Sequence, residues 1–182
     1  MSSLEVPGLD VSGRVRARDI QMAGVADVRR RVLMISGAVD AVDHDVSMSL
    51  RLPEPGRWQV IKSESNLTDR TWLGMQITTD DDTHFVDGPD TMILSRQFAR
   101  TFLTPDLSRL MMFDGEVRPG EAVLMSFDLE CSARTAVYKH SRYVPDPGAD
   151  AAAVAAELER VVADGLPGRA TLEVAVPVTV IG

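Results

Sequence analysis

The chain has 182 residues, of which 45% are hydrophobic and 25% are charged, a length and composition typical of one folded domain. Its net charge of -8 disfavours binding to the phosphates of nucleic acids and to anionic lipid. The sequence also lacks the run of about 18 apolar residues that a membrane-spanning helix requires. We therefore expect neither a nucleic acid nor a membrane as a partner.

The only cysteine, Cys131, excludes a disulfide within the chain and fits a reducing compartment. The first residues, MSSLEVPGLDVSGRVRARD, lack the basic segment and apolar run of a secretory signal. Both observations predict a cytoplasmic protein. Cys131 lies on the apolar face of its predicted strand, which favours a buried, unreactive thiol over a nucleophile.

At the N-terminal end we predict an arm over residues 1–20, a candidate lid, followed by a single domain over 21–182. Residues 11–20 alternate between arginine and apolar residues, as a strand exposed on one face does. Residues 24–31 are expected to form a turn or a short helical piece. Residues 30–37, 44–52, 57–65 and 71–79 are predicted strands, and the segment PEPG at 53–56 predicts a turn.

In the middle of the chain, residues 91–103 fit either a helix or a strand, and their β-branched and aromatic content favours a strand. Residues 104–113 open with a helix-cap pattern and are expected to form one or two helical turns. The stretch EAVLMSFDLEC at 121–131 has one apolar and one polar face, and 135–144 is a further strand.

Near the C-terminus, residues 149–164 predict an amphipathic helix, with Asp150 as its N-cap and Gly165 just after its end. Residues 170–181 predict a final strand that is bulged or at a sheet edge at Pro177, because proline cannot donate a hydrogen bond to a neighbour. Eight or nine short strands and one helix favour an antiparallel barrel or sandwich. We favour a mainly β, calycin-like barrel of eight or nine strands with one C-terminal helix.

Two acidic stretches are weak candidates for metal binding, Asp80–Asp82 with His84 and Asp87, and Asp40–Asp45 with His44. Neither has the spacing of a calcium-binding loop, so we expect solvated turns and no metal. The sequence contains no Gly-x-Ser-x-Gly motif and no glycine-rich phosphate loop, so we expect no hydrolytic triad and no nucleotide cofactor. Gly56-Arg57-Trp58 has the Gly-x-Trp form that opens lipocalin barrels.

Nine methionines fall mostly on apolar strand faces, where flexible thioethers either fill a solid core or adapt to a ligand. We favour a cavity inside the barrel. The strand at 135–144 has Tyr138, His140 and Arg142 on one side, which predicts either polar contacts inside such a cavity or a half-exposed sheet edge. The residues predicted to bind substrate are Trp58, Met75, Gln76, Phe98, Met125, Phe127, Tyr138 and His140; no catalytic residue is predicted.

In chain size, N-terminal arm and the strands RWQVIKSES, TWLGMQITT and EAVLMSFDLEC, the sequence resembles the small bacterial β-barrel cyclases of spirotetronate and spirotetramate polyketide pathways. The resemblance implies an intramolecular [4+2] cycloaddition of a linear substrate, without a cofactor, in the biosynthesis of an antibiotic. Such a reaction needs a dry cavity that holds a flexible substrate in a near-attack shape.

Two other functions remain open from the sequence. The same barrel could serve as a non-catalytic carrier or sensor of a hydrophobic small molecule. A filled sandwich would instead suit an interaction or structural module. A homodimer is compatible with each of the three.

Overall fold

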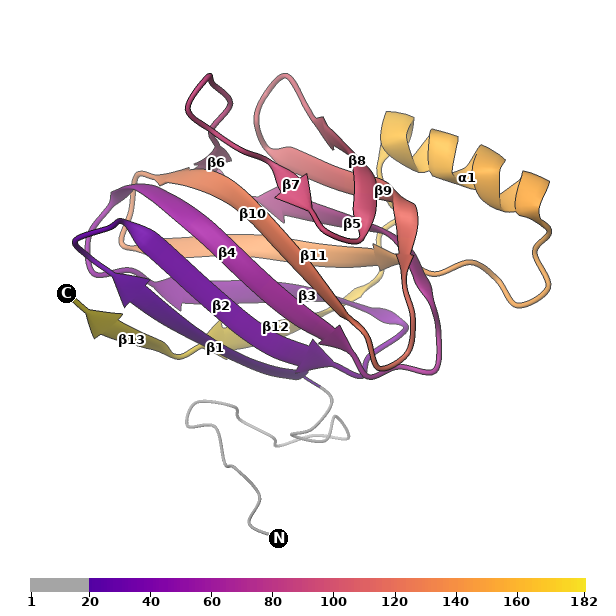
Figure 1. Cartoon of the computed structure of the whole chain (residues 1–182), viewed down its shortest axis with the longest axis horizontal. Helices are drawn as coiled ribbons and strands as arrows, with labels where there is room; N and C mark the ends of the chain where they lie inside the picture. Colours follow the sequence, from indigo (N-terminus) through magenta and orange to yellow (C-terminus); the bar gives the residue numbers. More distant parts are fainter. Residues whose placement is uncertain (1–19) are drawn as a thin grey trace, which may run out of the picture.

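The computed structural model describes residues 20–182, which form two β-sheets with one helix beside them (Figure 1). In the first sheet the strand order is β13-β1-β2-β4-β10-β6, and the short strand β7 also pairs with β10. Its strands are β1 (Ile20–Asp27), β2 (Val32–Val39), β4 (Gly56–Asn66), β6 (Thr83–Phe85), β7 (Leu94–Ser95), β10 (Ala122–Cys131) and β13 (Val178–Ile181).

The second sheet lies behind the first in Figure 1 and has the order β12-β3-β11-β5-β9-β8. Its strands are β3 (His44–Arg51), β5 (Trp72–Thr79), β8 (Phe98–Leu103), β9 (Arg109–Val117), β11 (Thr135–Tyr143) and β12 (Ala170–Val176). β11 lies between β3 and β5, so the alternative that it forms a half-exposed sheet edge is wrong.

The core lies between the two sheets and follows from the period-two alternation of the strands. Along β10, every second side chain from Val123 to Cys131 is buried, and β4 contributes Trp58 and Val60 to the same layer. β4 and β10 are paired over their whole length, from Ala122 opposite Ser65 to Cys131 opposite Gly56. The apolar face of the strand at 121–131 thus looks inward, onto the opposite sheet.

The expected architecture needs three corrections. The described chain has thirteen strands instead of eight or nine, because short strands such as β6 and β7 and a break at Pro177 add to the count. The sheets are mixed instead of antiparallel, since β1–β13, β2–β4 and β3–β12 are parallel pairs. Over residues 20–182 the strands form two separate hydrogen-bonded sheets, neither of which closes into a barrel.

Pro177 lies where the chain passes from one sheet to the other. β12 pairs with β3 at the edge of the second sheet, and after Pro177 the chain continues as β13 beside β1 at the edge of the first. The carbonyl of Pro177 accepts a hydrogen bond from Gly24 N at 2.8 Å. The predicted edge position of Pro177 is therefore confirmed.

The one helix of residues 20–182, α1 (Ala151–Asp164), agrees with its prediction. The Asp150 side chain caps it by accepting a hydrogen bond from Ala153 N at 2.8 Å, and Gly165 ends it at a φ of 83°. α1 packs on the outer face of the second sheet, where Val161 forms a small core with Met111 and Tyr143. This outer cluster is separate from the main core between the sheets.

Three local expectations are also corrected. Residues 24–27 belong to β1, with only a turn following them, and the expected strand at 11–20 lies outside the described residues apart from Ile20. Residues 91–103 form two short strands with a loop before them, so neither one helix nor one strand describes them. Residues 104–108 form a turn in which the Asp106 carboxylate accepts hydrogen bonds from the hydroxyls of Thr104 and Ser108, and β9 replaces the expected helical turns.

Candidate functional site

A group of charged and polar side chains lies between the two sheets. Lys62 and Glu64 continue the inner face of β4 beyond Trp58 and Val60, and Tyr138, His140 and Arg142 occupy the inner face of β11. We call these five residues, Lys62, Glu64, Tyr138, His140 and Arg142, the interior cluster. Each of them is at most 1% exposed, a degree of burial that lysine, glutamate and arginine seldom reach.

The centre of the interior cluster is a triangle of short contacts across the two sheets. Lys62 Nζ donates to Glu64 Oε2 at 2.7 Å and lies 3.0 Å from His140 Nδ1. His140 Nδ1 is also 2.8 Å from Glu64 Oε2. A carboxylate of the first sheet thus holds an imidazole of the second.

Arg142 extends the cluster toward β3 and β5. Its Nη2 donates to the carbonyl of His44 at 2.6 Å, and its Nη1 lies 3.7 Å from Glu64 Oε1. The guanidinium carbon is 5.3 Å from the centre of the Trp72 ring, within the range of a cation–π contact. Lys62 Nζ also lies 5.5 Å from the centre of the Tyr138 ring.

Burial is the largest influence on the pKa values of the five residues in the interior cluster. It lowers the pKa of His140 to about 4, although Glu64 beside it acts in the opposite direction, so the imidazole is neutral near pH 7. Burial also lowers the pKa of Lys62 and raises the pKa of Tyr138 far above its ordinary value. For Glu64 burial acts to raise the pKa, but His140 and Lys62 outweigh it, and the pKa lies well below its usual range.

Six buried polar atoms of this region have no hydrogen-bond partner among residues 20–182. They are Glu64 Oε1, Trp72 Nε1, Tyr138 OH, His140 Nε2, and Nε and Nη1 of Arg142. A buried polar group left without a partner costs about 1–3 kcal/mol, and native proteins contain few of them. Because buried groups with perturbed protonation cluster at functional sites, this region is the candidate functional site of the described chain.

The neutral imidazole can act in either of two forms. If Nδ1 carries the proton and donates to Glu64, Nε2 is a free base. If Nδ1 instead accepts from Lys62, Nε2 carries the proton and is a donor. In many catalytic sites a carboxylate likewise contacts the histidine ring and fixes its orientation. The interior cluster can therefore hold an oxygen atom by hydrogen bonds and can give or take one proton at His140 Nε2.

The strand register surrounds the interior cluster with methionines. Met125 is paired with Lys62, Met48 with Tyr138, and Met75 with Arg142. All three methionines are buried between the sheets. Their flexible thioethers can change rotamer to admit an apolar chain next to the polar atoms.

Seven of the eight residues predicted to bind substrate lie in this interior. Met125, Tyr138 and His140 are in or beside the interior cluster, as is Met75, whereas Phe98 and Phe127 belong to the apolar core. Trp58 is four residues before Lys62 on β4, about 13 Å away at the rise of a strand. There its ring stacks under Arg31 and its Nε1 donates to the carbonyl of Glu54.

Gln76 is the one predicted residue that the structure places outside the interior. Gln76 lies between Met75 and Ile77, which both face the inner layer, so ordinary alternation turns it outward. The irregularity of β5 between Trp72 and Gly74 acts earlier in the strand, where it brings Trp72 into the inner layer. The Gln76 side chain accepts from Leu166 N, in the segment after α1. It is part of the outer packing and not of the interior.

Lys62, Glu64, Arg142 and Trp72 were not among the predicted site residues. A signal for the first two was present, because Trp58, Val60, Lys62 and Glu64 alternate along one strand face that changes from apolar to charged. Arg142 shares its strand face with Tyr138 and His140. The inward position of Trp72 had no such signal, since the irregularity in β5 is not visible in the sequence.

The other candidates for chemistry are not supported. Cys131 is buried as expected, and burial raises the pKa of its thiol to about 11, so it is not a nucleophile at neutral pH. Asp80 and Asp82 lie in a turn closed by hydrogen bonds to Ser132 and to each other. Within residues 20–182 no group of three or more His, Cys, Asp or Glu side chains is placed to hold a metal ion.

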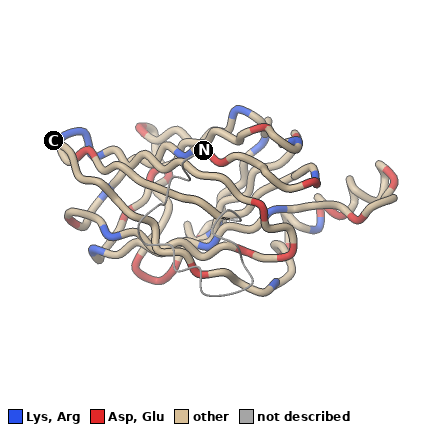
Figure 2. The backbone as a smooth tube through the Cα atoms, turned by 90° about the horizontal axis from the view of Figure 1, so that it is seen from below, with Lys and Arg blue, Asp and Glu red and all other residues tan. Residues whose placement is uncertain are grey.

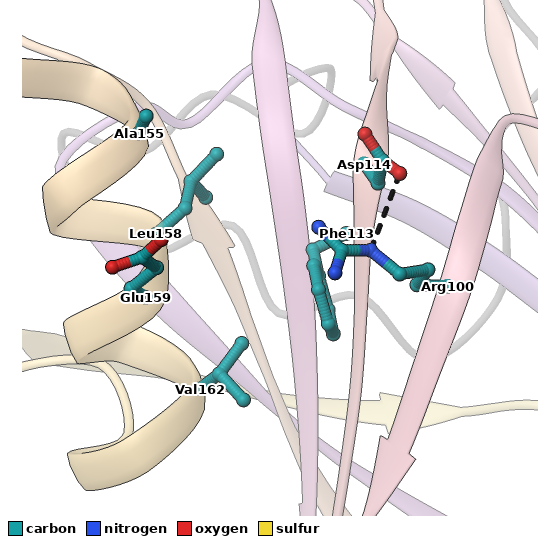
Figure 3. A pocket seen from close by; sticks show the side chains of 7 residues that line it. All are labelled: Arg100, Phe113, Asp114, Ala155, Leu158, Glu159 and Val162. Atoms are coloured by element: carbon teal, nitrogen blue, oxygen red, sulfur yellow. Dashed lines mark ion pairs between the residues drawn. The ribbon is translucent and has the colours of Figure 1, made fainter. Parts of the chain in front are cut away.

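A hollow of about 350 Å³ lies on the outer face between α1 and strands β8 and β9. Figure 3 shows Leu158 and Val162 of α1 directed toward Phe113, beside the ion pair of Arg100 with Asp114. Arg100 and Asp114 are paired at 3.2 Å and are both largely exposed. The outer hollow lacks the buried, unpartnered polar atoms of the interior cluster.

The surface charges give no sign of a polyanion-binding face. Figure 2 shows basic and acidic positions interspersed over the described chain instead of separated onto opposite sides. Among the described residues, no helix is long and apolar enough to cross a membrane.

Comparison with known protein families matches residues 22–182 to a family of unknown function, DUF6423. The chain belongs to this family. The match spans both sheets, α1 and the whole interior cluster, so the site described above lies within the shared domain of the DUF6423 family. No curated protein and no solved structure matches the chain.

Proposed function

We propose that this DUF6423 protein binds an apolar small molecule between its two sheets and acts on it through the interior cluster. The observation that carries the proposal is the set of six buried polar atoms without a hydrogen-bond partner among the described residues, beside the apolar core between the sheets. Keeping a lysine, a glutamate and an arginine in that position costs several kcal/mol per charge unless a further interaction offsets it.

We infer further that the two sheets work as the wall of a barrel around this site. On one side the chain crosses from β12 to β13 at Pro177 and so joins the outer strands of both sheets. On the other side β7 pairs with β10 of the first sheet and lies beside β8 of the second. These crossings support a calycin-like enclosure in which a guest contacts both sheets.

The reaction we propose is a cofactor-independent intramolecular [4+2] cyclisation of a linear, polyketide-like substrate. Two carbon–carbon σ bonds form at the expense of two π bonds of the same molecule, so the product is an isomer and no co-reactant is needed. A hydrogen-bond donor on a carbonyl conjugated with the dienophile would lower the barrier, and Tyr138 OH or Arg142 Nε could serve as that donor. The apolar walls would restrict the flexible substrate to its reactive shape.

A non-catalytic carrier or sensor is the second candidate. The observation that favours it is that donors held by fixed partners, such as Arg142 on the His44 carbonyl, would bind a ligand oxygen without any proton transfer. A carrier of this kind would release its ligand unchanged.

Turnover of model substrates separates the two candidates. The protein would be incubated with linear trienones that each carry a conjugated diene and an enone, and their cyclised isomers would be quantified by chromatography. We expect faster cyclisation than in buffer, and a loss of that acceleration in Tyr138→Phe combined with Arg142→Met. Binding without acceleration would favour the carrier, and acceleration retained in the double variant would overturn the role of the interior cluster.

Three further proposals rest on the sequence. The arm at 1–20 would cover the end of the domain at which the described chain begins, beside Ile20. That end also carries the interior cluster, because Ile20 is paired with Val39 and Val39 with Asn66, two residues beyond Glu64. A cytoplasmic location and a homodimeric state remain predictions.

A further inference from the structure

We propose that the interior cluster recognises a single carboxylate at one end of an apolar ligand. This inference rests on the proposed function, since it assumes that a ligand enters between the sheets, and it specifies the chemical class of that ligand. The class is that of a medium-chain or long-chain organic acid, with its head group at Arg142 and Trp72 and its chain along the methionines.

The first argument is the balance of donors and acceptors. Of the six atoms without a partner among residues 20–182, Arg142 Nε, Arg142 Nη1 and Trp72 Nε1 can only donate. Tyr138 OH and His140 Nε2 can do either, and Glu64 Oε1 alone can only accept. A ligand that satisfies these atoms must therefore supply acceptors, and a carboxylate supplies two oxygens that accept and never donate.

The second argument is charge. The interior cluster contains two basic side chains, Lys62 and Arg142, but one carboxylate, Glu64, and its imidazole is neutral. Asp45 on β3 also acts on the charge of Arg142, but Asp45 is itself paired with Lys139 at 3.7 Å, so this additional acid is matched by a further basic group. One further carboxylate would pair each basic group with an acid, whereas a phosphate, with about two negative charges, would exceed that balance.

The third argument is position. Arg142 is anchored by the His44 carbonyl and by the face of Trp72, so its remaining donors have a fixed direction. Met75 lies beside Arg142 in the register, and Met48 and Met125 lie beside the other members of the cluster. A charged head at Arg142 therefore places the following apolar chain against adaptable side chains.

The test compares an acid with its own ester. Binding of the fluorescent polyene cis-parinaric acid to the full chain would be titrated beside binding of its methyl ester, which has the same chain but no negative charge. We expect the acid to bind at least about tenfold more tightly, because hydrogen bonds to a charged group are roughly twice as strong as neutral ones. Trp72→Phe, which removes one donor and keeps an aromatic side chain, should reduce the preference for the acid several-fold.

Arg142→Met should abolish the preference while leaving binding of the ester. The matched control is Arg100→Met, which removes an exposed arginine from the outer hollow and should leave the preference unchanged. Equal binding of acid and ester would overturn the carboxylate assignment and leave the proposed function standing. Binding of neither would overturn both, and loss of the preference in Arg100→Met alone would place the acid in the outer hollow.

Discussion

At the scale of the residue, Glu64 is the acid on which the interior cluster depends, since it contacts Lys62, His140 and Arg142. Replacing it by glutamine leaves two buried basic groups without a counter-charge. We expect Glu64→Gln to lower the free energy of unfolding by about 3–5 kcal/mol, the usual cost of breaking a buried ion pair on one side. Urea unfolding of the variant measures this loss.

The control removes the charges together. In Lys62→Met, Glu64→Leu and Arg142→Met combined, no buried charge is left unpaired, and stability should recover to within about 2 kcal/mol of the parent or exceed it. The combined variant should at the same time lose ligand binding. A Glu64→Gln variant as stable as the parent would show that this carboxylate is not the counter-charge of the cluster.

His140 predicts a pH dependence of stability. Burial lowers its pKa in the folded protein to about 4, below the ordinary value of 6.5, so the unfolded chain binds the proton more readily. Stability is therefore fully present above about pH 6.5 and falls by up to about 1.4 kcal/mol per pH unit as the pH drops toward 4. The lowered pKa of Glu64 acts in the same direction, but only below its own ordinary value of 4.5.

Unfolding measured between pH 7 and pH 4 in the parent and in His140→Asn tests this expectation. The slope between pH 6.5 and 4.5 should be smaller in the variant, because there Glu64 contributes little. Equal slopes would show that His140 takes up its proton in the folded state as readily as in the unfolded chain.

The residues of the site could be predicted only in part. Tyr138, His140 and Met125 follow from period-two alternation, and the same reasoning applied to 57–65 would have placed Lys62 and Glu64 beside them. Gln76 lies next to Met75 in the strand, so alternation alone turns the two side chains to opposite faces. The inward position of Trp72 could not be predicted, because it depends on an irregularity in β5. Contacts such as Lys62 with His140 join residues 78 apart in the chain, and they depend on strand order.

At the scale of the element, α1 is the part of the described chain that depends most on local signals. Val161 is its only buried residue, so its stability rests on a small outer core and on its cap at Asp150. We expect Asp150→Ala to destabilise the helix by about 1 kcal/mol, the usual value for loss of an N-cap. Amide hydrogen exchange should quicken about fivefold in α1 and remain unchanged in β4 and β10.

Glu159→Ala, at an exposed position of the same helix, is the matched control and should leave exchange in α1 unchanged. Equal acceleration in α1 and in the central strands of the first sheet would contradict the view that the helix opens by itself.

The elements show which sequence signals are local and which are not. Alternation and turn residues predicted the strands 44–52, 57–65, 71–79 and 121–131 to within a few residues, because burial on one face fixes them. The parallel pairing of β2 with β4 brings together segments separated by β3, and no local pattern encodes it. At 104–108 the polar side chains that suggested a helix cap close a turn instead, with Leu107 at a φ of 59°.

At the scale of the whole molecule, residues 1–20 are predicted to regulate access to the interior. Because Ile20 is buried at the start of β1, the deletion that tests this should end at residue 19. We expect the shortened chain to unfold at the same urea concentration as the parent but to cyclise the trienones several-fold more slowly, since water would reach the site. Unchanged turnover would show that residues 1–20 do not act as a lid.

The methyl groups of the methionines report most directly on whether a guest enters between the sheets. In a protein labelled with ¹³C at these methyls, titration with cis-parinaric acid should shift Met48, Met75 and Met125, which lie beside the interior cluster. Met111, under α1, and the exposed Met34 and Met92 should not shift. Shifts confined to Met111, Met34 or Met92 would contradict an interior binding site.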